Sequence, residues 1–521
     1  MDRGSRDSSN HAEGAVAIPG VAATPVRWGG TMSADPVEGT EEVDVIVVGG
    51  GGAGMAAAAA AAESEPDADV VLLQKLDELG GTTTMAMGSY AAANTDLQAE
   101  RGIDDSAAAH AADLGRFLRA AADPTERHPI LDRQQALEET DDRRLRRLLV
   151  ENAGETLSWL EDLGCEHVGP YWEPPHRVPR LHQIVPDTDA YADVLGDQLR
   201  DRGVEVLLRT RARQLVTENG RIVGVNAETE SGSRTIRSRN GVVLATGDYH
   251  SSQRLRERYT TDSGTPPITE FNTGDGHQMA AEVGARLVGM DVQLLFLRMG
   301  APLYTSPDVA ALVEDGAVIV NERGERFVTE AVDYEQLLYA TVDQPGSCLY
   351  VVFDESIASR YTEWPNYLST LGKDGKMWGY VDDYLEYGGL HRSESLEALA
   401  EKVGIPTDTL ATTLTEYNDG VEIGAHVVDP MGRERTRRRL REPPFYALGP
   451  VNAYAGSAEG GIDVTAEMAA LDEGGEPIKG LYAAGSAAGS VQLFGHGHHL
   501  PWAFTTGRIA GRAAVDDRDH D

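Results

Sequence analysis

The feature of this chain that most limits its fold is a glycine-rich turn between two short apolar segments. Residues 43–48 (VDVIVV) are apolar and β-branched, which predicts a buried strand, and residues 69–73 (DVVLL) predict a second one. A G-x-G-x-x-G turn and an alanine-rich helical segment separate them. A strand–turn–helix–strand unit of this size predicts a parallel sheet covered by helices.

The glycines of the turn stand where a bound dinucleotide needs them. Gly49 permits the tight turn after the strand, Gly51 lets the backbone approach a pyrophosphate, and Gly54 lets helix and strand pack closely. Gly52 and Ala53 lie at the N-terminus of the helix, where free N–H groups face the phosphate charge. In this frame the motif predicts a dinucleotide site, whereas the glycines alone would be weak evidence.

The end of the second strand departs from the usual pattern. An acidic residue is expected there to accept hydrogen bonds from the ribose hydroxyls, but the chain has Gln74, followed by Lys75. The amide of Gln74 still offers a carbonyl acceptor, so we expect ribose contact without charge assistance. The alternative is that Gln74 lies at the surface and other residues hold the ribose.

The apolar segments divide the chain into a nucleotide domain and an insertion. The strand–helix rhythm stops near residue 292 and returns near residue 441. We therefore expect an α/β fold with a discontinuous Rossmann-type domain (41–291 and 441–521), an inserted α+β capping domain (292–440) and a disordered tail (1–40). The other expected elements are helices over 105–165, 189–201, 275–284 and 500–515 and strands over 204–208, 221–225, 242–245 and 481–484.

The charge of the chain argues against several classes of partner. Asp and Glu number 84 against 46 Lys and Arg, of which only five are Lys, and the net charge is −38. A field of this sign repels nucleic acids and anionic membrane surfaces, so neither is an expected partner. The acids are spread along the whole chain, which favours a halophilic protein, adapted to high salt, over one with an acidic partner-binding tail.

The remaining composition points to a cytoplasmic protein. No apolar run reaches the roughly 18 residues of a membrane span, and residues 1–27 contain neither an apolar signal core nor a twin arginine. Cys165 and Cys348 are too few to ligate an iron–sulfur cluster or to form a disulfide framework. Met32 is an alternative start to Met1, because every recognisable motif follows it.

Further motifs follow in order along the chain. They are Gly80-Gly81-Thr82-Thr83-Thr84, Met87-Gly88, Leu244-Ala245-Thr246-Gly247, Thr273-Gly274-Asp275-Gly276, Asn321-x-x-Gly324-x-Arg326-Phe327-x-x-Glu330, Gly460-Gly461-Ile462-Asp463, Gly480-Leu481-Tyr482-Ala483-Ala484-Gly485 and Gly507-Arg508-Ile509-Ala510-Gly511. In order and spacing the series resembles the fumarate reductase and 3-ketosteroid dehydrogenase flavoprotein superfamily, over about residues 43–515.

This resemblance implies FAD as the cofactor. The helix that begins near Leu500-Pro501 would then point its positive end at the N1/C2 edge of the flavin and stabilise the anionic reduced ring. No histidine lies between His11 and His110, so FAD is expected to be non-covalent. Besides the turn residues, Gln74 and Lys75, the resemblance assigns cofactor contacts to Gly80, Gly81, Thr82, Thr83, Gly88, Thr246, Gly247, Asp275, Gly485, Ser486, His499 and Leu500.

The substrate side separates the branches of the superfamily. The fumarate branch clamps a dicarboxylate with Arg and His. The corresponding positions hold neither residue, because they fall on Tyr334, near Phe296, on Ser457 and near Phe494. The ketosteroid branch has a tyrosine base at the offset of Tyr334, which implies that Tyr334 removes a proton while a hydride passes to flavin N5. The alternative is a tyrosine packed at the domain seam.

The steroid pattern is also incomplete. Its second tyrosine falls on Asp113, and its carbonyl-polarising tyrosine falls near Leu493. Instead, His496, His498 and His499 precede the last helix. We expect His496 or His498 to bind substrate or relay a proton and His499 to lie by the flavin, and no metal is expected, because zinc sites need further ligands at fixed geometry.

These features favour an FAD-dependent oxidoreductase acting on CH–CH groups, which dehydrogenates a C–C bond next to a carbonyl or reduces it in reverse. Its partners would be a small-molecule substrate and an unidentified electron acceptor. Two alternatives stay open. One is a fumarate-like dicarboxylate reductase whose clamp uses other arginines, such as Arg298. The other is a non-catalytic FAD-binding protein that relays electrons.

Overall fold

The computed structural model describes residues 41–120, 141–172, 176–260, 265–299, 309–330, 334–362, 380–422, 438–489, 491, 493 and 497–517. The expected tail of residues 1–40 lies outside this part of the chain. None of the described helices is long and apolar enough to cross a bilayer.

The largest sheet has eight strands and contains the expected strand–helix–strand unit. Along its main path the order is β17 (Ala469–Leu471), β18 (Pro477–Ala483), β9 (Gly232–Leu244), β1 (Glu41–Val48), β2 (Val70–Leu73) and β6 (Glu205–Leu207), with β7 (Arg211–Glu218) and β8 (Arg221–Thr229) attached through β9. Strand β1 runs parallel to both neighbours, and Val48 pairs with Leu73 and Leu244. The carboxyl ends of three strands therefore meet at one edge, where α/β sheets bind ligands.

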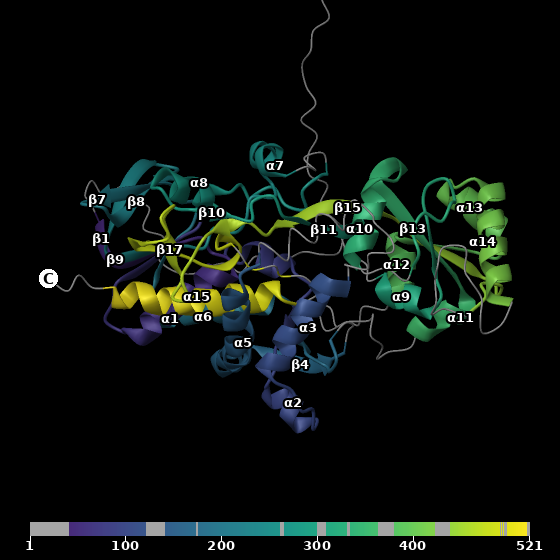
Figure 1. Cartoon of the computed structure of the whole chain (residues 1–521), viewed down its shortest axis with the longest axis horizontal. Coiled ribbons are helices and arrows are strands. Elements are labelled where there is room, and N and C mark those ends of the chain that lie inside the picture. Colours follow the sequence, from purple (N-terminus) through teal and green to yellow (C-terminus); the bar gives the residue numbers. More distant parts are fainter. Residues whose placement is uncertain are drawn as a thin grey trace, which may run out of the picture. The chain divides into compact units, whose positions relative to one another are not determined.

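Two helices from opposite ends of the chain cover this sheet side by side (Figure 1). They are α1 (Gly52–Ser64), buried from Gly52 to Ala62, and α15 (His499–Asp516). A Cβ on Gly507 would overlap the carbonyl oxygen of Ala53, and one on Gly511 would overlap that of Ala57. The alanine run and these glycines thus allow the two helix backbones to approach closely.

A second sheet lies mainly in the inserted segment. Its order is β11 (Gln293–Met299), β15 (Phe445–Ala458), β13 (Cys348–Asp354) and β12 (Val318–Val320), with β14 (Leu390–Ser393) paired to β15, and all pairs are antiparallel. The helices of this segment are α9 (Ala310–Asp315), α10 (Tyr334–Val342), α11 (Glu355–Ala358), α12 (Tyr380–Tyr387), α13 (Leu396–Val403) and α14 (Thr407–Glu422). β15 follows the expected domain boundary at residue 441, yet it pairs with the strands of the inserted segment. The domain limits stay a prediction.

A three-stranded sheet, β3 (Ser89–Ala91), β5 (Leu181–Val185) and β4 (Glu166–Tyr171), completes the part that positions the site. The expected helical region over 105–165 contains α3 (Ala107–Ala120) and α5 (Arg143–Leu163). The remaining elements are α2 (Asp96–Glu100), α6 (Asp189–Asp201), α7 (Gln253–Tyr259), α8 (Asp275–Glu282) and the short pair β10 (Leu287–Val288) and β16 (Gly461–Ile462).

Candidate functional site

The glycine-rich turn has the conformation that a dinucleotide site requires. Gly49 leaves β1 with φ +112°, and a Cβ there would overlap the carbonyl oxygen of Ala245. A Cβ on Gly54 would overlap the carbonyl oxygen of Gly49. Gly51, the N-cap of α1, is different, because a Cβ there would meet only the oxygen of Gly80, at 3.8 Å. Gly49 and Gly54 are thus required by the protein itself, whereas Gly51 leaves open space beside the N-terminus of α1.

The paired glycines close the other side of this turn. Gly80 N donates to Gly50 O at 2.8 Å, and Gly51 forms a β-bridge with Gly80. Gly81 and Thr82 begin the 3₁₀ helix Gly81–Met85, in which Thr83 is buried. The hydroxyl oxygen of Thr83 accepts from Gly52 N at 3.0 Å. The threonine segment therefore lies at the N-terminus of α1, and the cofactor contacts that the resemblance assigns to it stay a prediction.

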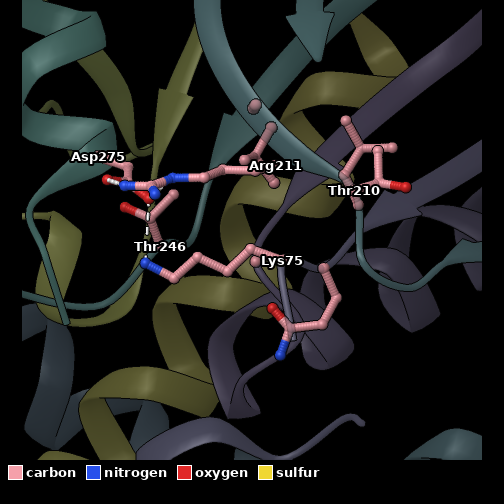
Figure 2. Close-up of a pocket in the computed structure, with 10 residues that line it drawn as sticks. Lys75, Thr210, Arg211, Thr246 and Asp275 are labelled. Carbon is pink, nitrogen blue, oxygen red and sulfur yellow. Dashed lines mark hydrogen bonds and ion pairs between the residues drawn. The ribbon is translucent and has the colours of Figure 1, made fainter. Parts of the chain in front are cut away.

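A pocket opens at the carboxyl ends of β1 and β2 (Figure 2). It lies at the edge of the sheet where α/β folds bind their ligands. Five of the predicted cofactor residues line the pocket: Gly49, Gln74, Lys75, Thr246 and Asp275. Thr210 and Arg211, which no sequence pattern indicated, line it too.

Three charged side chains form a network at the wall of this pocket. Lys75 Nζ lies 3.0 Å from Asp275 Oδ2, and Arg211 Nη2 lies 2.7 Å from Asp275 Oδ1. Burial lowers the pKa of Lys75, against the opposite effect of Asp275. Burial alone would raise the pKa of Asp275, but hydrogen bonds and charge from Arg211 and Lys75 outweigh it and lower the pKa. The network thus keeps two cations and one carboxylate beside the nucleotide pocket.

Thr246 and Gln74 differ in whether other residues of the protein satisfy their side-chain hydrogen-bonding groups. Thr246 Oγ1 is buried and has no hydrogen-bond partner among the described residues, so a bound group can supply one. Gln74 Oε1 instead accepts from Gly50 N at 3.4 Å, and its Nε2 donates to Glu78 O at 2.9 Å. Gln74 is buried, and its amide is hydrogen-bonded to the glycine turn. Its contact with the ribose stays a prediction.

The C-terminal part of the expected nucleotide domain (441–521) brings Gly485 and Ser486 to the start of α15. Gly485 N donates to Thr506 Oγ1 at 2.8 Å, and Trp502 Nε1 donates to Gly485 O at 3.0 Å. Ser486, Trp502 and Glu459 line a second pocket. Glu459 was not predicted, and its Oε1 lies 2.9 Å from His499 Nε2. His499 is therefore held by a carboxylate, while the flavin contact expected of it is not tested.

The N-terminus of α15 is built around His498. His498 is the N-cap residue, and its carbonyl accepts from Trp502 N at 3.1 Å. The N–H groups of His499 and Leu500 precede this first helical bond, and Pro501 has none to offer. No acid lies in the first turn of either α15 or α1. Neither first turn therefore contains a negative charge that would repel an anion.

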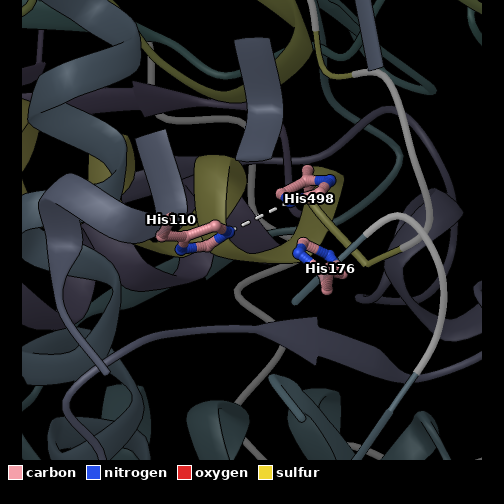
Figure 3. A group of neighbouring side chains, drawn as sticks. All are labelled: His110, His176 and His498. Carbon is pink, nitrogen blue, oxygen red and sulfur yellow. Dashed lines mark hydrogen bonds between the residues drawn. The ribbon is translucent and has the colours of Figure 1, made fainter. Parts of the chain in front are cut away.

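The structure pairs His498 with histidines from distant segments. His110 of α3 and His176, which follows β4, lie beside it in a buried group (Figure 3). His110 Nε2 and His498 Nε2 are 3.2 Å apart. Burial and the neighbouring His498 and His176 hold the pKa of His110 well below its usual value. Sequence analysis missed His110 and His176, because no local motif contains either of them.

A buried ion network lies next to these histidines. Arg180 Nη2 lies 2.6 Å from Asp105 Oδ1, and Arg180 Nη1 lies 2.5 Å from Asp113 Oδ2. All three side chains are at most 1% exposed. Arg180 Nη1 also donates to His176 Nδ1 at 3.1 Å. Asp113, at which the sequence pattern of the steroid branch places a tyrosine, is thus an ion-pair partner of Arg180.

The other predicted residues are placed less completely. Gly88 O accepts from Ile184 N at 3.3 Å and ties the threonine segment to β5. Gly247 follows β9 with φ +72°. Tyr334 begins α10, but its side chain lies outside the described part of the chain, as does the whole of His496. No role of either residue is tested.

Comparison with known proteins agrees with the nucleotide site. A family described as the FAD binding domain matches residues 44–497. The chain is 29% identical over 388 residues to the NADH:acrylate oxidoreductase of Vibrio harveyi, which covers 71% of this chain but only 36% of that protein. It is 29% identical over 339 residues to the 3-oxosteroid 1-dehydrogenase of Mycolicibacterium smegmatis, which covers 58% of this chain and 56% of that protein.

Among solved structures, the open conformation of a flavocytochrome c3 fumarate reductase matches with a TM-score of 0.76 at 25% identity. This match covers 92% of the present chain and 79% of the other. The expected architecture, an α/β fold built on a parallel sheet, is therefore confirmed. The relatives include proteins named for both branches that the sequence motifs resembled.

Proposed function

Since the chain belongs to the FAD binding domain family, we propose that it is an FAD-dependent oxidoreductase acting on a C–C bond next to an electron-withdrawing carbonyl. FAD fits the residues present. Gly51 leaves room at the N-terminus of α1, and Thr246 Oγ1 has no hydrogen-bond partner among the described residues. The pyrophosphate would lie at the N-terminus of α1, where Thr83 Oγ1 accepts from Gly52 N. We expect the cofactor to be held without a covalent bond.

The observation that supports this proposal best concerns charge. In a chain with a net charge of −38, the first turns of α1 and α15 contain no acid. A pyrophosphate at α1 and a negatively charged reduced ring at α15 are the groups that such helix ends stabilise. An electron-relay protein also needs FAD, so this observation supports the cofactor more directly than the reaction.

The substrate end would use groups that hold or move a proton. FAD, when bound, supplies the hydride acceptor or donor at N5. Tyr334 is our candidate base, and His498, with His496, is our candidate for hydrogen bonding to the carbonyl or for proton relay. A relative named as a 3-oxosteroid 1-dehydrogenase and one named as an NADH:acrylate oxidoreductase agree with this class of reaction.

An anaerobic substrate screen tests the proposal. Purified holoprotein is mixed with ketosteroids, cyclic enones or dicarboxylates, and the flavin absorption near about 450 nm is followed. Bleaching by a saturated ketone, or reoxidation of the reduced protein by an enone, is the expected result. If no compound of these classes changes the flavin in either direction, the electron-relay alternative is favoured.

We predict that Tyr334→Phe keeps FAD bound but slows flavin reduction at least about tenfold, because loss of an acid–base group typically costs 10²–10⁴ in rate. Stopped-flow spectroscopy with the best substrate of the screen measures the rate. Tyr339→Phe is the matched control, since Tyr339 lies on the same helix and its hydroxyl donates to Gln293 O at 2.9 Å. Equal reduction rates for wild type and Tyr334→Phe would remove Tyr334 from the mechanism.

The second candidate is a reductase of a dicarboxylate, and the similarity to the fumarate reductase structure favours it. Arg298, its candidate clamp residue, lies on β11, where Nη1 donates to Ile268 O at 3.0 Å. Fumarate turnover with a reduced viologen dye, lost in Arg298→Met, would establish this function in place of the first.

We also infer a cytoplasmic protein of a high-salt cell that passes electrons to an acceptor still to be identified. The net charge of −38 supports salt adaptation, because molar salt screens the self-repulsion of the surface acids. The midpoint of thermal unfolding should therefore rise between dilute buffer and molar KCl. A midpoint that is unchanged or falls would contradict this inference.

A further inference from the structure

Three histidines that are far apart in the sequence meet in one buried group. His110 comes from α3, His176 from the segment after β4 and His498 from the N-cap of α15 (Figure 3). Their exposed fractions are 0%, 3% and 0%. The ring centroids form a nearly equilateral triangle with sides of 5.4, 5.5 and 5.6 Å. Three imidazoles thus face one another where water hardly reaches.

The ring nitrogens have the spacing of metal ligands. His110 Nε2 and His498 Nε2 are 3.2 Å apart, and one nitrogen from each of the three rings lies within 4.8 Å of the others. In a tetrahedral zinc site with Zn–N distances near 2.0–2.1 Å, two ligand atoms lie about 3.3 Å apart. One edge of such a site is therefore already formed, and an edge at the 4.8 Å limit would have to shorten by about 1.5 Å.

One nitrogen of the His110 ring is not engaged by its own protein. His110 Nδ1 has no hydrogen-bond partner among the described residues. The other nitrogen, Nε2, lies 3.2 Å from His498 Nε2, so a metal between these two rings would replace a contact that joins two of its own ligands.

The charges around the group offset one another. Arg180 donates to His176 Nδ1, and it is the nearest cation. Its charge is matched by the buried carboxylates of Asp105 and Asp113. A dication bound by the histidines would therefore not face a net positive surrounding. Binding through His176 Nε2 would displace the proton on that nitrogen, because Nδ1 already accepts from Arg180.

We propose that His110, His176 and His498 bind one divalent transition-metal ion of the Zn²⁺ class. The donors are all nitrogen, which selects against Mg²⁺ and Ca²⁺ and suits Zn²⁺, Co²⁺ or Ni²⁺. Three protein ligands leave a fourth position for water or a substrate oxygen. The site goes beyond the proposed function, because binding of FAD does not require it. With the ion bound, a ring nitrogen of His498 would hold the metal, so the direct substrate contact proposed above would fall to His496. The site joins three segments that are distant in the chain.

Metal binding tests this proposal directly. The full chain is purified with FAD and without a histidine tag, stripped with a chelator and titrated with Co²⁺ or Zn²⁺. We expect about one ion per chain and, with Co²⁺, the visible absorption of a four-coordinate site. His110→Gln and His176→Gln should each weaken binding at least about a hundredfold, since even the loss of a group behind a ligand costs 10–100-fold.

The matched control is His391→Gln. His391 lies on β14 and pairs with Ala447 in the second sheet, so its loss should leave metal binding unchanged. FAD content and circular dichroism establish that each variant is folded. The proposal is overturned if wild type takes up no stoichiometric ion, or if either folded histidine variant binds as tightly as wild type. Should both variants fail to fold, the Co²⁺ spectrum of wild type decides alone.

Discussion

Replacing Gly54 with alanine is expected to yield a protein that no longer retains FAD. The new Cβ would overlap the carbonyl oxygen of Gly49, so the backbone of the turn must move away from the start of α1. Overpacking of this kind costs about 1–3 kcal/mol and displaces the N–H groups that would hold the pyrophosphate. FAD content after gel filtration and the thermal unfolding midpoint of the apoprotein measure the two effects.

The matched variant is Gly51→Ala. Its Cβ would meet only the oxygen of Gly80, at 3.8 Å, which is an ordinary contact. The apoprotein should therefore unfold at the wild-type temperature, while FAD is lost because the methyl group enters the space of the phosphate. Retention of FAD by Gly51→Ala would mean that the pyrophosphate does not lie on this turn.

Replacing Arg180 with methionine is expected to destabilise the protein by about 3–5 kcal/mol, because it leaves the buried carboxylate of Asp105 without its cation and removes one of the arginines that pair with Asp113. Arg180 binds Asp105 with Nε and Nη2, at 2.7 and 2.6 Å, and Asp113 with Nη1 at 2.5 Å. The measurement is the midpoint of thermal unfolding at a fixed excess of FAD. Arg147→Met is the control, since Arg147 is exposed and pairs only with Glu151 on its own helix, so its midpoint should not change.

The effect of Arg180→Met should depend on pH in a defined direction. Burial would raise the pKa of Asp113, but hydrogen bonds from Arg180 and Arg177 lower it overall. In wild type this carboxylate therefore contributes stability above its unfolded pKa of about 3.9, and that stability is lost as the pH falls through the folded pKa. Without Arg180 the pKa of Asp113 in the folded state rises, so protonation of Asp113 removes a buried charge that destabilises the variant. The difference in midpoint should shrink towards pH 4, and a constant difference would argue against an electrostatic origin.

Local sequence was enough to predict the nucleotide-binding elements. The apolar runs 43–48 and 69–73 became β1 and β2, and the helix expected over 189–201 has these bounds as α6. The strand expected over 242–245 is the end of the longer β9 (Gly232–Leu244). Its first half, residues 232–238 (GSRTIRS), has a single large apolar side chain, Ile236, and it is a strand because it pairs with β8. Strand pairing of this kind depends on the tertiary structure, which an apolar run in the sequence does not reveal.

The side of the site away from the nucleotide could not be predicted in the same way. The histidines singled out from the sequence are neighbours in the chain, but His498 meets His110 and His176, while His499 contacts Glu459. Along a helix start, adjacent side chains point in different directions, so spacing in the chain did not indicate which rings meet. Arg211 likewise reaches Asp275 from a separate strand, and no motif marks it.

The close contact between α1 and α15 bears on when the protein can acquire its cofactor. Ala53 and Ala57 of the first helix are covered by Gly507 and Gly511, which follow them by about 450 residues in the chain. A nascent chain thus exposes an apolar alanine face until α15 has been made. Stable loading of FAD must therefore wait for α15, and a chain truncated before residue 499 should be colourless and dependent on chaperones.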